Sequence, residues 1–156
     1  MKKVFMLILV CTLLLAVVYA PSTGTAAQEM GERATALLVE KAVAFLKANG
    51  KDASFAEFNK SNGKFSDGSR YVYVVDSKGN TLAHGGNSGM IGKNLYELKD
   101  SDMKPFMKEI INNAMSEGFG WVDYKWPNLP ISNKAVLRSA YFKKVNDVII
   151  ISSTLK

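Results

Sequence analysis

The sequence predicts an α+β domain in which helices pack against an antiparallel sheet of about five strands. Three observations predict this class. A long segment near the N-terminus has apolar residues at helical spacing, the second half of the chain contains β-branched and aromatic runs typical of strands, and short links join the last three of these runs. Short links imply antiparallel neighbours, and we expect the helices to lie together on one side of the sheet.

The N-terminal segment is typical of an export signal. Two lysines follow the first methionine, an uncharged apolar stretch covers 4–20, and small residues lead to Ala26 and Ala27. This order predicts a signal peptide at 1–27, cleaved after one of those two alanines, and a single extracytoplasmic domain at 28–156, either periplasmic or secreted. The alternative is a retained membrane anchor over 4–20, because its 17 residues reach the lower limit for a spanning helix.

Export would also change the composition of the chain. It would remove the only cysteine, Cys11, and two lysines, so the net charge would fall from +6 to +4, with 18 basic and 14 acidic side chains. Acidic residues are interspersed among the basic ones in the remaining 129 residues, which argues against a nucleic-acid-binding face. One histidine without a cysteine cannot complete an ordinary transition-metal site. We therefore expect no cofactor, no metal and no nucleic-acid partner.

The first predicted elements are helical. Ala34, Leu38, Ala42 and Phe45 recur at helical spacing within a helix predicted over 29–49. Gly50 suits the left-handed position that follows a helix. Ser54 and Glu57 have the spacing of a capping box, which predicts a second, short helix over 55–60.

Strands follow the helical half. The run 71–76 is aromatic and β-branched, 77–80 is rich in turn residues, and 81–84 is predicted to return as the second strand. The glycine-rich segment 85–89 is predicted to be a flexible loop.

One further helix interrupts the strands. Asp100-Ser101-Asp102 can cap its start, and Pro105 is tolerated in its first turn. Three more strands are predicted at 121–126, 136–145 and 148–154. The buried stripe of this helix is predicted to consist of Phe106, Met107, Ile110, Ile111 and Ala114.

Several motifs, in this order, are similar to those of the single Cache domains, a family of PAS-like extracytoplasmic sensor domains. The similarity extends over about residues 34–152. The motifs are Ala44-Phe45-Leu46-Lys47-Ala48-Asn49-Gly50, Phe55-Ala56-Glu57-Phe58, Tyr71-Val72-Tyr73-Val74-Val75-Asp76 with Gly79, Leu82-Ala83-His84-Gly85, Ile91-Gly92-Lys93-Asn94-Leu95, Gly120-Trp121-Val122-Asp123-Tyr124-Lys125-Trp126-Pro127-Asn128 and Tyr141-Phe142-Lys143-Lys144-Val145.

The resemblance implies a long N-terminal helix packed on a PAS-like antiparallel sheet with a connecting helix. It also implies a pocket for a small molecule between the sheet and the helix and loops. Members of the family usually sense small metabolites, often organic acids or amines, for receptors or kinases. Because the sequence ends at Lys156, straight after the last predicted strand, we expect a free-standing sensor domain of this type.

Aromatic residues on the strands are the first candidate ligand-binding residues. Because side chains alternate along a strand, Tyr71 and Tyr73 share a face, and so do Tyr124 and Trp126, with Trp121 on the opposite face. Tyrosine and tryptophan combine a flat apolar wall with one directional donor, which suits a small-ligand site. We expect the pocket walls to include Tyr73, Tyr124, Trp126 and Tyr141.

Charged and titratable residues complete the candidate site. His84, the only histidine, could bind a carboxylate of the ligand. Arg138 and Lys143 fall on opposite faces of one strand, so either could hold a carboxylate, depending on which face meets the pocket. Arg70 is a third candidate, and the loop 85–94 could close over a ligand.

The sequence therefore predicts an exported domain that binds a small polar metabolite, such as an organic acid or an amine, and contributes to signal transduction through a membrane receptor or kinase. The alternative is a structural or protein-interaction module with a vestigial pocket. An enzyme is not expected, because neither a Ser-His-Asp set nor a thiol nor a metal cluster is legible in the sequence.

Overall fold

The computed structural model describes residues 25–67, 69–127 and 131–156. The predicted signal peptide lies outside the described residues except for 25–27. Across the described part, neither helix combines the length and the apolar character needed to cross a bilayer.

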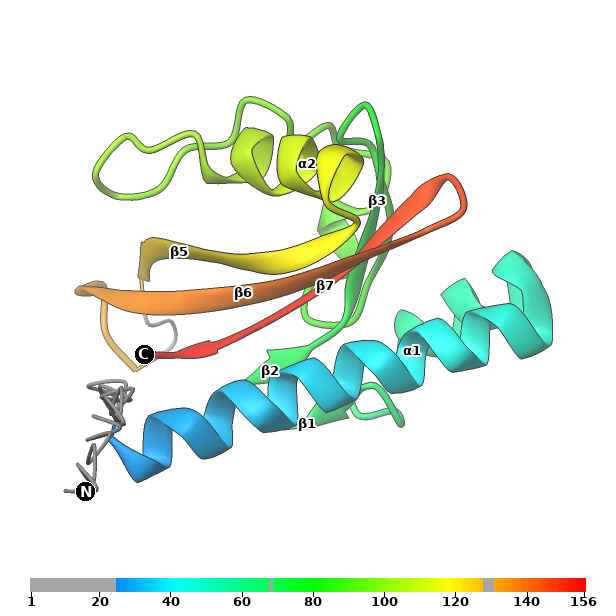
Figure 1. Cartoon of the computed structure of the whole chain (residues 1–156), viewed down its shortest axis with the longest axis horizontal. Coiled ribbons are helices and arrows are strands. Elements are labelled where there is room, and N and C mark those ends of the chain that lie inside the picture. Colours follow the sequence, from blue (N-terminus) through cyan, green and yellow to red (C-terminus); the bar gives the residue numbers. More distant parts are fainter. Residues whose placement is uncertain (1–24, 68, 128–130) are drawn as a thin grey trace, which may run out of the picture.

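The described part of the chain contains two α-helices, one 3-10 helix and seven strands (Figure 1). They are, in chain order, α1 (Ala26–Phe58), β1 (Ser66–Asp67), β2 (Arg70–Tyr71), β3 (Tyr73–Asp76), β4 (Thr81–His84), η1 (Ser88–Met90), α2 (Phe106–Ser116), β5 (Phe119–Pro127), β6 (Ala135–Val145) and β7 (Val148–Leu155).

Five of the strands form one antiparallel sheet in the order β4-β3-β7-β6-β5. The small strands β1 and β2 form a separate two-stranded pair, which the sequence did not predict because each strand has only two residues. The α+β class, the five-stranded sheet, the long N-terminal helix and the connecting helix are confirmed.

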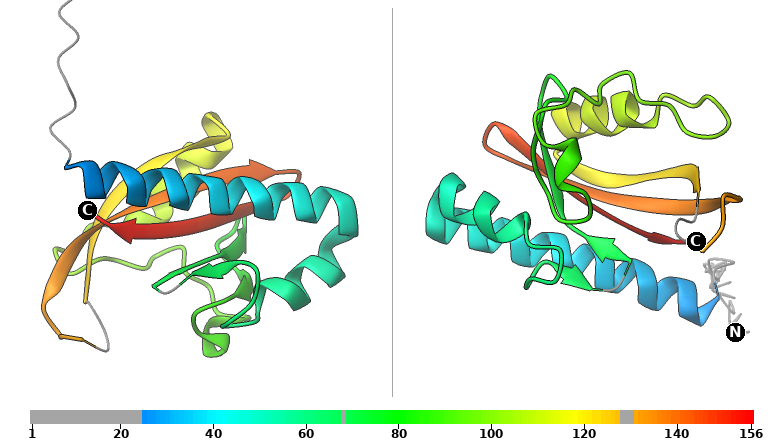
Figure 2. Two further views of the ribbon diagram at one scale, coloured as in Figure 1. Left: turned by 90° about the horizontal axis from the view of Figure 1, so that it is seen from below. Right: turned by 180° about the vertical axis from the view of Figure 1, so that it is seen from behind.

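The two helices cover opposite faces of the sheet, so the expectation that they share one side is wrong. Figure 1 and the right-hand view of Figure 2 show α1 below the sheet and α2 above it. The physical reason lies in β7, which is apolar on both faces. Val148 and Ile150 pack in the core beneath α1, whereas Ile149 and Ile151 pack in the core beneath α2. A strand with two apolar faces needs cover on both.

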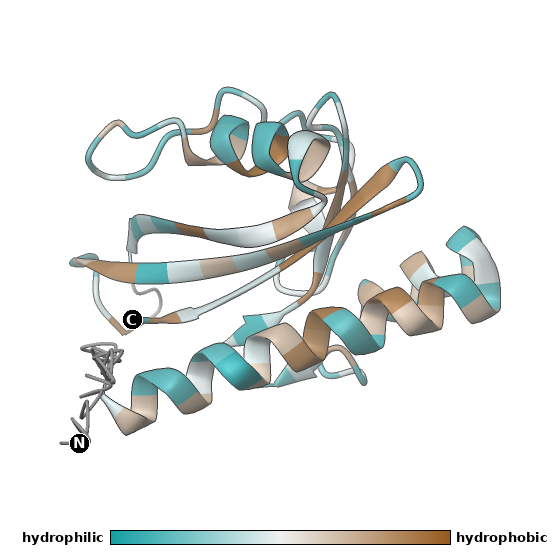
Figure 3. Ribbon diagram, viewed as in Figure 1, coloured by the Kyte–Doolittle hydropathy of each residue, from teal (hydrophilic) through white to brown (hydrophobic). Residues whose placement is uncertain are grey.

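Hydropathy follows this arrangement. In Figure 3 the apolar colour gathers on the middle of α1 and on β7, where helix and sheet face each other. Val39, Ala42 and Val43 supply the helix side of that contact and are buried. The solvent side of α1 is mixed: it carries Arg33, Lys41 and Lys47, but also the exposed side chains of Met30 and Leu37.

The long helix contains a kink where the sequence predicted an end. Gly50 has a φ of 75° and a ψ of 177°, which interrupts the helical backbone. Helix resumes at Lys51, so the predicted capping box is wrong: Ser54 is buried inside the second segment, and its hydroxyl has no hydrogen-bond partner in the described part. At the other end α1 starts three residues earlier than predicted, with Thr25 as its N-cap.

The second helix starts later than predicted. Asp100 does not cap it but closes a turn, where its Oδ1 accepts hydrogen bonds from the amides of Asp102 and Lys104 at 2.9 Å each. Pro105 is therefore the N-cap and not a first-turn residue. The five residues of the predicted apolar stripe are all buried, as expected.

Candidate ligand-binding site

A cavity of about 590 Å³ lies on the α2 side of the sheet. It is bordered by residues of β1–β6, of α2 and of the chain that connects β4 to α2, and it is partly open to solvent. The lining residues are Ser61, Ser66, Ser69, Tyr71, Tyr73, His84, Gly85, Gly86, Asn87, Met90, Leu95, Leu98, Phe106, Met107, Tyr124, Trp126, Pro127, Ile131 and Arg138.

Five of the seven predicted site residues line this cavity: Tyr73, His84, Tyr124, Trp126 and Arg138. Strand register explains why they meet. Tyr73 is the direct cross-strand partner of His84, and Tyr124 is the partner of Arg138. Residues directly opposite each other in a sheet project from the same face, so each pair reaches the same cavity.

The other two predicted residues lie on the opposite face, beneath α1. The Tyr141 hydroxyl donates to Glu40 Oε1 at 3.1 Å, and Lys143 Nζ lies 2.7 Å from Glu40 Oε2. Both are an odd number of residues from Arg138, so the alternation of the strand turns them away from the cavity. The expectation that Tyr141 walls the pocket is therefore wrong, and of the two alternative cations Arg138 is the one that meets the cavity.

His84 is held as a neutral imidazole. Its Nδ1 accepts hydrogen bonds from the amides of Asn87 at 2.9 Å and Gly86 at 3.3 Å. Two donors directed at Nδ1 require its lone pair, so the ring proton resides on Nε2. Burial lowers the pKa of His84 to about 4. The ring is therefore a neutral hydrogen-bond donor at physiological pH, and not the imidazolium that a carboxylate would otherwise attract.

The tyrosines beside His84 are also donors. The rings of Tyr71 and Tyr73 lie 5.1 and 5.3 Å from the His84 ring. Burial raises the pKa of both tyrosines, the nearby Tyr124 raises it further, and the charge of Arg138 offsets part of the rise. Tyr73 donates to the Met107 sulfur at 3.8 Å, which is a weak acceptor that a ligand oxygen could replace.

Arg138 is the charged residue of the cavity, and only 8% of it is exposed. Its Nε donates to Ser153 Oγ at 3.3 Å, and one terminal nitrogen lies 3.5 Å from the Ser69 carbonyl oxygen. Tyr124 shares the same serine through a 3.0 Å hydrogen bond. These partners are all neutral.

An aromatic wall closes the cavity on the side of α2. The Phe106 and Tyr124 rings stack with centroids 4.3 Å apart, and the Trp126 ring meets Phe106 edge-on at 5.8 Å. Phe106 and Met107 were predicted only as core residues. They reach both the core and the cavity because α2 covers the sheet at this point.

Tyr71 is a cavity residue that the sequence prediction omitted, although it was expected to share a face with Tyr73. The signal was present in the alternation of 71–76. In the structure the chain changes partner between Tyr71, in β2, and Tyr73, in β3, and both rings still face the cavity.

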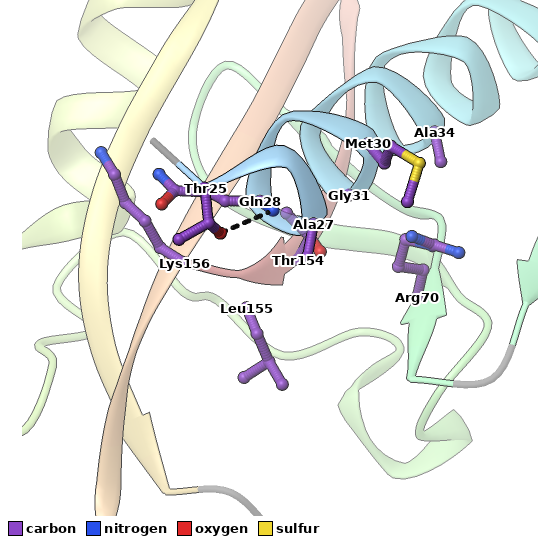
Figure 4. A pocket seen from close by; sticks show the side chains of 10 residues that line it. All are labelled: Thr25, Ala27, Gln28, Met30, Gly31, Ala34, Arg70, Thr154, Leu155 and Lys156. Atoms are coloured by element: carbon purple, nitrogen blue, oxygen red, sulfur yellow. Dashed lines mark hydrogen bonds between the residues drawn. The ribbon is translucent and has the colours of Figure 1, made fainter. Parts of the chain in front are cut away.

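A second hollow lies at the N-terminal end of α1, next to the end of β7 (Figure 4). Its two cations already have partners. Arg70 contacts Asp67 at 2.6 Å, and Lys156 pairs with Asp123. Arg70, the third candidate cation, thus lies away from the other predicted site residues. The α2-side cavity is the stronger candidate because its cation has no such partner.

The described residues contain no group of three or more His, Cys, Asp or Glu side chains suited to hold a metal ion. What the cavity does offer is a set of hydrogen-bond donors around one positive charge. Such a set can bind an acceptor-rich, anionic small molecule and hold it against aromatic walls.

These features define a PAS-like sensor domain. A sequence model of one family, described as single Cache domain 2, matches residues 57–154. This is more than half of the chain, and the chain therefore belongs to the single Cache domain 2 family, as its motifs predicted. Cache domains of this kind are sensory ligand-binding modules. A comparison with curated proteins finds no match.

Solved structures show the same fold. The chain is similar to a periplasmic sensor domain of a chemotaxis protein (21% identity, TM-score 0.64, 85% of this chain and 99% of that one). It is also similar to a methyl-accepting chemotaxis protein from Vibrio parahaemolyticus RIMD 2210633 (19% identity, TM-score 0.67, 81% of this chain and 89% of that one). A third similar structure is a Cache chemosensory domain studied for carboxylic acid recognition (20% identity, TM-score 0.66, 85% of this chain and 99% of that one).

Proposed function

We propose that this domain binds a small organic acid in the α2-side cavity and transmits the binding event to a signalling partner. The observation that carries the proposal is Arg138, a buried guanidinium without a carboxylate partner among the described residues. The sequence outside the described ranges contains no Asp or Glu. A buried charge without a counter-ion is costly, and a ligand carboxylate would supply the counter-ion through two parallel hydrogen bonds.

The lining residues favour an acid over an amine. They include no Asp or Glu that could neutralise a ligand ammonium group. Their titratable members are one arginine, one histidine held neutral and three tyrosines, all of which can donate hydrogen bonds. Donors complement a carboxylate, which is an acceptor only.

Partners and location follow from the same proposal. Structurally similar proteins include sensor domains of chemotaxis proteins, and we propose a membrane receptor or kinase as the partner of this domain. The leader-like residues 1–27 support an extracytoplasmic site of action, with a signal peptide removed on export. N-terminal sequencing of the mature protein tests this part: a new terminus at Ala27 or Gln28 is expected, and an intact Met1 would favour a retained anchor.

Calorimetric titration of the purified domain at pH 7 with a panel of organic acids and a matched panel of amines tests the ligand class. At least one acid is expected to bind at micromolar to millimolar concentration and to raise the melting temperature by mass action. Binding of amines in preference to acids would overturn the proposal. If neither panel binds, while a stoichiometric protein partner is captured without any small molecule, the interaction-module alternative is correct.

A further inference from the structure

We propose that the cavity selects monocarboxylates with an uncharged, mainly apolar body and rejects dicarboxylates. This inference rests on the proposed function, because it assumes that Arg138 receives the ligand carboxylate. Beyond the proposed function, the inference specifies how many charges the ligand carries and that the rest of the ligand is mainly apolar.

The charge count of the cavity is the first argument. Of the 19 lining residues, Arg138 alone is a permanent cation, and none is a lysine. His84 cannot add a second positive charge without giving up the two amide hydrogen bonds at Nδ1. One ligand carboxylate therefore neutralises the cavity. A second carboxylate enclosed there would find no counter-ion.

The internal gaps in the described ranges add no ionisable side chain to this count. The gap between Pro127 and Ile131, which both line the cavity, holds Asn128, Leu129 and Pro130. The other internal gap is a glycine.

The volume and the walls are the second argument. About 590 Å³ exceeds what a two- or three-carbon acid fills, so the cavity has room for a ligand with a longer body. Leu95 and Leu98, from the chain that precedes α2, line the cavity together with Phe106 and Trp126. Apolar walls favour an alkyl or aryl body over a polar one.

A dicarboxylate could enter by taking up a proton on its second group. A carboxyl group titrates well below pH 7, so protonating the second group costs a large loss in affinity at pH 7 and a much smaller one at pH 5.5. Discrimination against dicarboxylates should therefore be strong at pH 7 and should shrink as the pH falls. This pH dependence distinguishes a charge effect from a steric one.

The test uses four probes that separate charge from size: hexanoate, adipate, monomethyl adipate and propionate. Calorimetric titration of the purified domain at pH 7 is expected to show hexanoate and monomethyl adipate binding at least tenfold more tightly than adipate. Hexanoate is also expected to bind at least tenfold more tightly than propionate. At pH 5.5 the gap between monomethyl adipate and adipate should narrow.

A substitution at the rim of the cavity tests the charge count directly. Ile131 lines the cavity and is 82% exposed, so a charged side chain can replace it without burial in the core. Ile131→Arg adds the missing second cation and is expected to raise the affinity for adipate relative to hexanoate at least fivefold. Ile131→Gln, which adds polarity without charge, is the matched control and should shift this ratio of affinities less than twofold.

The outcomes separate this inference from the proposed function. If adipate binds the unmodified domain as tightly as monomethyl adipate, the selection for one charge is wrong, although the organic-acid site stands. If propionate binds as tightly as hexanoate, the inferred preference for an apolar ligand body is wrong. If amines bind and none of the four acids does, the proposed function itself fails.

Discussion

The two faces of the sheet carry similar residues, but the cation has different partners on each face. Beneath α1, Tyr141 and Lys143 converge on Glu40, so the cation has its carboxylate within the protein. Beneath α2, Tyr73 and Arg138 line a cavity, and the described residues offer the cation only neutral partners. We therefore propose a ligand site only on the face where no helix supplies a counter-ion to the cation.

The largest expected effect is the difference in ligand affinity between variants of the two cations, Arg138 and Lys143. Arg138→Gln is expected to weaken organic-acid binding at least 100-fold, about 3 kcal/mol, because a charge-assisted pair to the carboxylate is lost. Lys143→Gln, the matched change on the other face, should alter the affinity less than threefold. Calorimetric titration of both variants measures this. Equal losses would mean that the two faces do not differ in function.

Acidification should lower the free energy of unfolding of the domain through His84, a residue of the cavity. Its pKa is about 4 in the folded protein and about 6.5 when unfolded, so between these values the unfolded state binds the extra proton. Stability from this group is complete above pH 6.5 and is lost as the pH falls to 4, by up to about 3 kcal/mol. Urea denaturation from pH 7 to pH 4 measures the loss.

The control for this loss is His84→Asn, which keeps a hydrogen-bond acceptor near the Nδ1 position without a titrating ring. The variant should show a smaller decline between pH 6.5 and 4 than the unmodified domain. Parallel curves would show that the acid sensitivity comes from other groups.

Two glycine substitutions, one on each side of the sheet, should differ in their effects on stability and on binding. A Cβ on Gly86 would lie 2.5 Å from the rigid Tyr71 ring, and one on Gly31 would lie 2.9 Å from Thr154 Oγ1, which can rotate away. Gly86→Ala is expected to cost about 1–3 kcal/mol of stability through overpacking, whereas Gly31→Ala, inside α1, should cost less because alanine favours the helix. Only Gly86→Ala should weaken organic-acid binding, since it displaces a wall of the cavity. Thermal unfolding and calorimetry together test this, and intact binding by Gly86→Ala would contradict it.

The smallest effect is expected on the α1 face. Burial, together with the hydrogen bond to Glu40, raises the pKa of Tyr141 to about 12. Glu40→Gln should lower this pKa toward 10, while stability changes by less than about 1 kcal/mol because the ion pair with Lys143 is partly exposed. Ultraviolet titration of the tyrosines measures the shift. A change in ligand affinity would show that the faces are coupled.

Sequence patterns predicted the strands more accurately than the helix ends. The strands predicted over 136–145 and 148–154 match β6 and β7 within one residue. The starts of α1 and α2 were missed by three or more residues. Strand period and turn residues are local properties, whereas Asp100 closes a turn by also accepting a hydrogen bond from the Lys125 amide of β5, a contact that only the folded chain provides.

The features of the candidate site likewise divide into those that local sequence predicts and those that depend on the folded chain. Alternation along a strand, a local property, already placed Arg138 and Lys143 on opposite faces and Trp121 opposite Tyr124. Which face meets a cavity could not be predicted, because it depends on where α1 and α2 pack. The same holds for His84, whose neutral state depends on burial and on two loop amides.

The sequence by itself determined the class of the domain, the order of its elements and the chemistry of its side chains, because hydrophobic period and residue type are written locally along the chain. The tertiary structure decided that the helices cover both faces, that Glu40 neutralises one cation, and that Arg138 is left with a cavity beside it. Those outcomes depend on contacts between residues far apart in the chain, and these contacts turn a strand residue into a candidate ligand-binding residue.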